Sequence, residues 1–90
     1  MAKVVLKDFF ATWCPPCKMQ GPIIEELEKE YGKKVTFEKV NIDANQAEAE
    51  KFNVMAVPTL IILRDDKEFK RIVGLSNKEM LKELLTQAMK

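Results

Sequence analysis

The sequence predicts an α/β domain in which three helices flank a four-stranded mixed β-sheet. Three observations lead to this fold class. Strand-like and helix-like segments alternate over residues 3–52, which indicates parallel strands joined by a helical crossover. Two β-rich runs, Thr59–Leu63 and Phe69–Val73, then follow each other across a short polar loop, as in an antiparallel hairpin. The chain ends in an amphipathic pattern that is typical of a helix lying on a sheet.

The first half of the chain contains the predicted crossover. A strand is expected at Lys3–Phe10, because this run has apolar residues on both faces and suits a central, covered strand. A helix is predicted over Cys14–Tyr31, with an apolar stripe on one side. Gly32 provides a left-handed stop, and Pro22 predicts a kink inside the helix. Lys34–Ile42 is expected to form the second strand.

The second half begins with a short helix, which Asn45 is predicted to cap because Glu48 follows three residues later. Residues 64–67 are expected to form the hairpin loop. Ser76 and Glu79 predict a capping box for the last helix. The apolar face of that helix consists of Leu81, Leu84, Leu85 and Ala88. Four methionines are interpreted as core gap fillers, namely Met19, Met55, Met80 and Met89.

Length and charge limit the possible functions. Ninety residues with 47% hydrophobic content are expected to form one domain over residues 1–90. The 15 basic and 14 acidic side chains nearly balance, which disfavours nucleic acid and anionic membranes as partners. Lys7 and Asp8 interrupt the apolar N-terminal stretch, so neither a signal peptide nor a membrane span is expected. The expected location is therefore the reducing cytoplasm.

Histidine is absent from the sequence, which excludes a Cys-His protease site and removes the usual zinc ligand. The two cysteines could supply at most half of a tetrahedral metal site, so no metal site is predicted within one chain. In a reducing compartment, paired cysteines are more often catalytic or metal-binding than structural.

Cys14 and Cys17 carry the strongest chemical signal. Two cysteines three residues apart at the start of a helix lie on one face, with their Cα atoms about 5 to 6 Å apart, which allows a disulfide. The helix N-terminus favours a thiolate at Cys14, whose pKa is expected to lie about one unit below about 8.5. We expect Cys14 to be exposed and Cys17 to be shielded. Pro15 and Pro16 suit the first turn, because they lack N–H groups that would have no acceptor there.

The segment Asp8–Lys18, with its Trp-Cys-Pro-Pro-Cys core, resembles the active-site segment of the thioredoxin family. Further matches over essentially the whole chain are Lys39–Asp43, Val57–Thr59 and the Val73–Gly74 pair. The resemblance implies a thioredoxin-like fold that lacks the family's usual first strand and helix. Typical members have Gly at the position of Pro15, and Asp66 stands where a hairpin glycine is usual. The Cys-Pro-Pro-Cys version is similar to membrane-tethered cytochrome-maturation reductases and tryparedoxin-like proteins.

The resemblance also implies roles for residues outside the cysteines. Asp8 is interpreted as a buried acid that, with Lys39, manages the proton of Cys17, although sequence alone also allows a polar residue at a strand end. The resemblance implies a cis bond before Pro58, which would free the Val57 backbone to pair with an extended substrate. The remaining residues implied to form a shallow apolar surface around Cys14 are Trp13, Ile42, Ala56, Val73 and Gly74.

The leading functional hypothesis is a protein-disulfide reductase in which Cys14 attacks a substrate disulfide and Cys17 resolves the mixed disulfide. This reaction needs no cofactor besides the Cys14–Cys17 disulfide. The expected partners are disulfide-containing proteins and either a thioredoxin reductase or a small-thiol electron donor, and a monomer is expected. Two alternatives remain. One is a glutaredoxin-like, glutathione-dependent reductase, and the other is a dimeric metal or iron-sulfur module that uses two cysteines from each chain.

Overall fold

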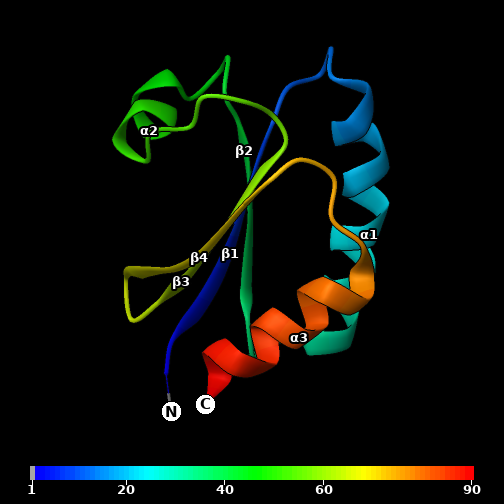
Figure 1. Cartoon of the computed structure of the whole chain (residues 1–90), viewed down its shortest axis with the longest axis vertical. Coiled ribbons are helices and arrows are strands. Elements are labelled where there is room, and N and C mark those ends of the chain that lie inside the picture. Colours follow the sequence, from blue (N-terminus) through cyan, green and yellow to red (C-terminus); the bar gives the residue numbers. More distant parts are fainter. Residues whose placement is uncertain (1) are drawn as a thin grey trace.

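The computed structural model describes residues 2–90, which form one four-stranded sheet and three helices (Figure 1). The elements are β1 (Val4–Phe10), α1 (Pro15–Tyr31), β2 (Thr36–Asn41), α2 (Gln46–Lys51), β3 (Thr59–Arg64), β4 (Lys67–Val73) and α3 (Lys78–Met89). The strand order is β2-β1-β3-β4. β1 runs parallel to β2 and antiparallel to β3, and β3 pairs antiparallel with β4. The predicted fold class is therefore confirmed.

Helices α1 and α3 cover one face of the sheet and α2 lies on the other (Figure 1). β1 contributes side chains to the core on both faces of the sheet, because successive side chains of a strand point in opposite directions. Val4 and Leu6 pack with residues of α1 and α3, whereas Val5 and Phe9 pack on the α2 side. Each large apolar side chain buried in this way contributes about 1.5–3 kcal/mol. β1 is thus the central, doubly covered strand that the sequence predicts.

All four strands differ from the sequence prediction by one or two residues at one end or at both. The hairpin loop is only two residues long, because Asp65 and Asp66 adopt positive φ angles of 51° and 68°. A tight turn of this kind matches the twist of the flanking strands, so β4 begins at Lys67 rather than at Phe69. β2 is shorter than predicted and ends at Asn41, whose side-chain Oδ1 accepts the backbone N–H groups of the next turn.

The predicted capping box of α3 is wrong by one residue. Asn77 is the N-cap, and its Oδ1 accepts the backbone N–H of Met80 at 2.8 Å. Ser76 instead lies buried, with its backbone N–H and C=O both bonded to the side chain of Gln20. Asn45 occupies the N-cap position of α2, but its side chain donates to the carbonyl of Asn41. Sequence spacing located the start of α2 and missed that of α3 by one residue, and for neither helix did it identify how the first N–H groups are satisfied.

The interpretation of the methionines as gap fillers is wrong for three of the four. Met19 and Met55 are 61% and 92% exposed, and Met80 is also exposed. Met89 does pack against the core. The core is instead filled by branched aliphatic side chains, which leaves flexible thioethers available on the surface.

Candidate active site

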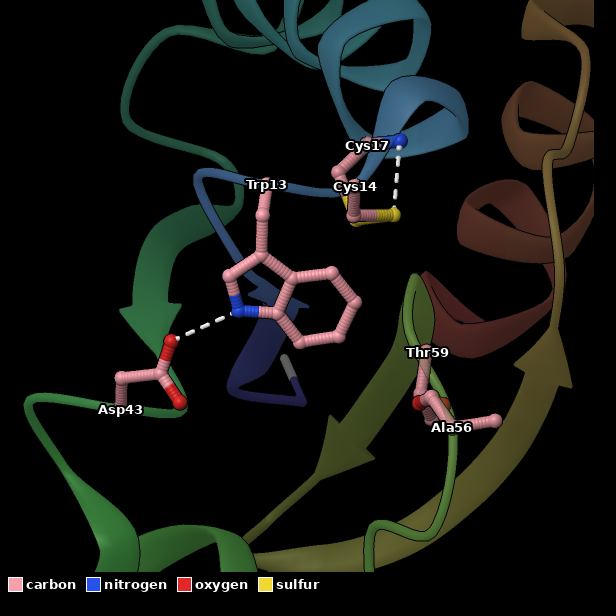
Figure 2. Close-up of a disulfide and its surroundings, with 6 residues drawn as sticks. All are labelled: Trp13, Cys14, Cys17, Asp43, Ala56 and Thr59. Carbon is pink, nitrogen blue, oxygen red and sulfur yellow. Dashed lines mark hydrogen bonds between the residues drawn. A yellow bond between two sulfur atoms is a disulfide. The ribbon is translucent and has the colours of Figure 1, made fainter.

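The two cysteines lie where the chain leaves β1 and enters α1. Cys14 is the N-cap of α1, and Pro15 and Pro16 occupy its first two positions. Cys14 and Cys17 form a disulfide with a Cα–Cα distance of 5.3 Å. The backbone N–H of Cys17 donates to Sγ of Cys14 at 3.2 Å (Figure 2). The Cys14 sulfur therefore satisfies one of the free N–H groups at the helix N-terminus.

Both cysteines are buried in this oxidised state, with exposed fractions of 3% for Cys14 and 6% for Cys17. The expectation that Cys14 is exposed is therefore wrong for the disulfide form. The physical reason is local packing, because the two cysteines form a small cluster with Ala11, against which Phe10 and Val57 also pack. The solvent-facing positions of this segment are taken by the flanking side chains, which are Thr12, Trp13, Pro15 and Pro16.

A cavity of about 460 Å³, open to the surface, is lined by residues of α1, of β1 and β2 and of the segment that joins β1 to α1. Of the two cysteines, Cys17 lines this cavity, together with Asp8 and Lys39. Lys39 stands opposite Asp8 in the β1–β2 register and forms an ion pair with Glu25, which also lines the cavity, at 3.2 Å. The structure thus brings Asp8, Cys17 and Lys39 together around one space, although they come from β1, α1 and β2.

Asp8 is the buried acid of this cavity, with an exposed fraction of 2%. Within residues 2–90 its Oδ1 has no hydrogen-bond partner. Burial raises the pKa of Asp8 from 3.8 to about 6, while the positive charge of Lys39 opposes part of this shift. A carboxyl group with such a pKa can both accept and release a proton near neutrality.

The segment before β3 lies against the cysteines. The Val57–Pro58 peptide bond is cis, and Pro58 is fully buried while Val57 packs on the cysteine cluster. Two hydrogen bonds hold the segment: Thr59 Oγ1 donates to the Ala56 carbonyl at 2.6 Å, and the Gly74 N–H donates to the Pro58 carbonyl at 2.8 Å. Figure 2 shows Ala56 on the loop that leads into β3 and Thr59 at the start of that strand.

The residues predicted to form an apolar surface differ in exposure. Trp13 and Val73 are 64% and 62% exposed, and Ala56 is also exposed. Ile42, Val57 and Gly74 are half-buried. Ile42 and Val57 contact the cysteine cluster directly. These residues come from the ends of β1, β2 and β4 and from the segment before β3, so they meet at one edge of the sheet.

Two residues of the site region were missed by sequence reasoning. Asp43 holds the Trp13 indole, because Trp13 Nε1 donates to Asp43 Oδ2 at 3.0 Å (Figure 2). The parallel pairing of β1 and β2 could have indicated this contact, because it brings the carboxyl ends of both strands to the same edge. Gln20 is the second missed residue. It is fully buried on α1, three residues after Cys17, and nothing in its sequence context predicts a partner at Ser76.

The residues that the structure describes contain no group of three or more side chains suited to hold a metal ion. Over the same residues, no helix combines the length and the hydropathy needed to cross a membrane. The chemical groups that the structure brings together at this site are the Cys14–Cys17 disulfide and the buried acid Asp8. A redox-active Cys-x-x-Cys pair at a helix N-terminus on a four-stranded mixed sheet defines the class of thiol-disulfide oxidoreductases.

Comparisons with known proteins agree with this class. The family model described as Thioredoxin matches residues 1–87. The chain is 46% identical over 84 residues to thioredoxin of Bacillus subtilis, an alignment that covers 93% of this chain and 81% of that protein. It is 46% identical over 90 residues to thioredoxin of Mycolicibacterium smegmatis, with 98% and 80% covered. The solved structure of Fasciola hepatica thioredoxin superimposes with a TM-score of 0.88 at 40% identity, covering 96% of this chain and 81% of that one.

The chain belongs to the thioredoxin family. It is a thiol-disulfide oxidoreductase that reduces protein disulfides through the Cys14–Cys17 pair. The enzyme class predicted from the sequence is thereby confirmed.

Proposed function

We propose that Cys14 is the attacking thiolate and Cys17 the resolving thiol of this reductase. In the reduced protein, the Cys14 thiolate attacks one sulfur of a substrate disulfide, forms a mixed disulfide and releases the other substrate sulfur as a thiolate. Cys17 then loses its proton and attacks Sγ of Cys14. This step releases the second substrate sulfur and forms the Cys14–Cys17 disulfide. Two electrons pass to the substrate in each cycle.

One observation carries the assignment: Cys14 Sγ accepts the N–H of Cys17 at the start of α1, whereas Cys17 lines the cavity that contains Asp8. A negative charge on Cys14 meets free N–H groups and the positive end of the helix dipole, which stabilise a thiolate. Cys17 lies one turn further along the helix. It shares this cavity with Asp8, a group that can take its proton.

Asp8 is the proposed proton acceptor for Cys17. Its carboxyl group shares a cavity with Cys17, and its pKa of about 6 makes it a carboxylate that can be protonated near neutral pH. Lys39 is the proposed modulator of this acid, because its positive charge favours the carboxylate form. Lys39 also forms an ion pair with Glu25, which lines the same cavity.

The proposed substrate site surrounds the cysteines. An extended substrate segment would pair with the backbone of Val57, which Pro58 presents next to the disulfide. Trp13, Ala56 and Val73 offer exposed apolar area to the same segment, while Ile42 and Gly74 supply the half-buried floor. A surface that combines backbone pairing with shallow apolar contact accepts many sequences, which suits a general protein-disulfide reductase.

The reduced state must be regenerated by a partner. We propose a thioredoxin reductase as the electron donor, with a small thiol as the alternative, and no external cofactor beyond the redox-active disulfide. The protein is proposed to act as a cytoplasmic monomer. In a reducing compartment, the Cys14–Cys17 disulfide is repeatedly reduced and re-formed, so it does not persist as a permanent crosslink.

Coupled insulin reduction tests this function. The oxidised protein is supplied with NADPH and a bacterial thioredoxin reductase, or in parallel with NADPH, glutathione and glutathione reductase. Turnover with the first system that depends on Cys14 supports the proposal. Turnover that requires glutathione would indicate the glutaredoxin-like alternative instead. Cys14→Ser is the control, because serine occupies the same position in the fold but lacks the nucleophilic thiol.

A further inference from the structure

The side chain of Gln20 connects the cysteine helix to the loop between β4 and α3. Gln20 Nε2 donates to the Ser76 carbonyl at 3.1 Å, and Gln20 Oε1 accepts the Ser76 backbone N–H at 2.9 Å. Both residues are buried, with exposed fractions of 0% and 1%. The buried amide of Gln20 pairs with both backbone groups of Ser76, as a neighbouring strand would. The two hydrogen bonds fix both the distance of Ser76 from α1 and its orientation.

The connected loop forms a wall of the proposed substrate site. The Gly74 N–H donates to the Pro58 carbonyl, so one end of the segment Gly74–Ser76 is tied to the Val57–Pro58 backbone. Gln20 ties the other end to α1. Val73 and Leu75, on either side of Gly74, are 62% and 45% exposed. The two ties hold the backbone of this wall while its apolar side chains remain free to contact a substrate.

These contacts form a continuous path that begins and ends at the cysteines. Cys17 and Gln20 are three residues apart and share the buried face of α1. From Gln20 the path continues through Ser76, Gly74 and Pro58 and returns to the cysteines through Val57, which packs against them. A change at Gln20 therefore alters the distance between the Gly74–Ser76 wall and the cysteines without touching either sulfur.

We propose that Gln20 is a positioning residue for substrate binding, which sets the Gly74–Ser76 wall against the cysteine helix and thereby fixes the width of the substrate site. This inference rests on the proposed substrate surface. It predicts that Gln20 matters for extended polypeptide disulfides, which contact the wall. Small disulfides that touch only the cysteines should be insensitive to it.

The test compares Gln20→Met with the wild-type protein on two substrates, a peptide with a disulfide in an extended segment and the small aromatic disulfide 5,5′-dithiobis(2-nitrobenzoate). Methionine keeps the size and removes both hydrogen bonds, which leaves the Ser76 backbone groups unpaired. We expect KM for the peptide to rise about tenfold with kcat unchanged. The rate with the small disulfide and the reduction potential should remain unchanged.

Two further variants separate positioning from stability. Ile24→Val weakens the core on the same helix at a fully packed site, and it should lower the melting temperature without changing KM for the peptide. Gln20→Asn keeps a neutral amide with both a donor and an acceptor on a shorter side chain and should give an intermediate KM, so it replaces Gln20→Met if that variant fails to fold. Amide hydrogen exchange at Ser76 should accelerate in Gln20→Met and stay slow in Ile24→Val.

The outcomes are distinct. An unchanged peptide KM in Gln20→Met, or an equal loss with both disulfides, would overturn the inference while the proposed function stands. A KM increase of the same size in Ile24→Val would assign the effect to stability and would also overturn it. Wild-type protein that reduces neither disulfide would contradict the proposed function itself.

Discussion

Asp8 and Cys17 line the same cavity, although one lies on the central strand and the other on the helix that follows it. Asp8 interrupts the apolar pattern of β1 at a point where the strand is covered on both faces. A carboxyl group in that place lowers stability, because the charged form loses its hydration. The proposed role of Asp8 as proton acceptor for Cys17 explains why this position carries a carboxyl group, and it leads to two predictions.

Asp8→Asn should slow the release of the mixed disulfide more than its formation, because the proposed proton acceptor serves Cys17 and not Cys14. We expect the resolving step at pH 7 to slow by about 100-fold, the lower end of the range for general base catalysis. In the wild-type protein, this step should accelerate as pH rises through about 6, where Asp8 becomes a carboxylate. Rapid-quench kinetics with a peptide disulfide measures both steps. Slowing of the attack step alone would refute the assignment, and Glu28→Gln, an exposed change on α1, is the control.

Asp8→Asn should also stabilise the oxidised protein at neutral pH. The pKa of Asp8 is raised in the folded state, so the folded protein holds a proton that the unfolded chain has released, and stability falls as pH rises from about 4 to about 6. The shift from 3.8 to about 6 corresponds to about 3 kcal/mol. Asparagine does not titrate in this range, so the variant does not show this loss of stability. The difference in unfolding free energy between variant and wild type, from urea denaturation, should grow over that pH interval and be constant above it. A difference that is independent of pH would show that Asp8 is not the titrating group.

Pro15→Gly should change the reduction potential while the fold remains intact. Pro15 is the first residue of α1 and lies on the surface, so it restricts the backbone between the sulfurs without contributing to the core. Glycine gives the open dithiol about 0.4–1 kcal/mol of additional conformational freedom, which disfavours the disulfide and raises the potential by about 10–20 mV. Equilibration with a glutathione redox buffer measures this change. An identical potential in both proteins would exclude a tuning role for Pro15.

Asn77→Ala should lower the free energy of unfolding by about 1 kcal/mol, because it removes the side-chain acceptor for the Met80 N–H. Ser76→Ala is the matched stability control. The Ser76 hydroxyl has no hydrogen-bond partner in the described part of the chain, so its removal should cost nothing. Urea denaturation of both variants gives the comparison. A larger loss of stability in Ser76→Ala than in Asn77→Ala would instead support the Ser76 cap that the sequence predicts.

Much of this fold could be predicted because its signals are local. The apolar residues on both faces identified β1 as a doubly covered strand, and the spacing of Cys14 and Cys17 predicted a disulfide. Two of the errors occur where a contact between distant residues decides the local structure. Ser76 has the sequence context of a cap, but Gln20, 56 residues earlier, takes its backbone groups. The burial of Cys14 likewise depends on Val57, which reaches it from the segment before β3.

Part of the candidate site could also be predicted from the sequence. The cysteine pair has its own chemistry, whereas the proposed roles of Asp8 and Pro58 came from family resemblance and remain proposals. Asp43 was missed as the partner of Trp13, because its role depends on the register of two parallel strands. A pattern within one element cannot supply that register.

The central claim is that Cys14 is the attacking thiolate and Cys17 the resolving thiol. Trapping of the mixed disulfide tests this claim most directly. Cys17→Ser retains the attacking thiolate but cannot complete the reaction, so it should accumulate a covalent adduct with a disulfide substrate that added thiol releases. Cys14→Ser has no nucleophile at the helix N-terminus and should form no adduct. Both variants are exposed to the substrate and analysed by non-reducing electrophoresis and mass spectrometry. An adduct in Cys17→Ser alone is the predicted result, and an equal adduct in Cys14→Ser, or none in Cys17→Ser, would contradict the account.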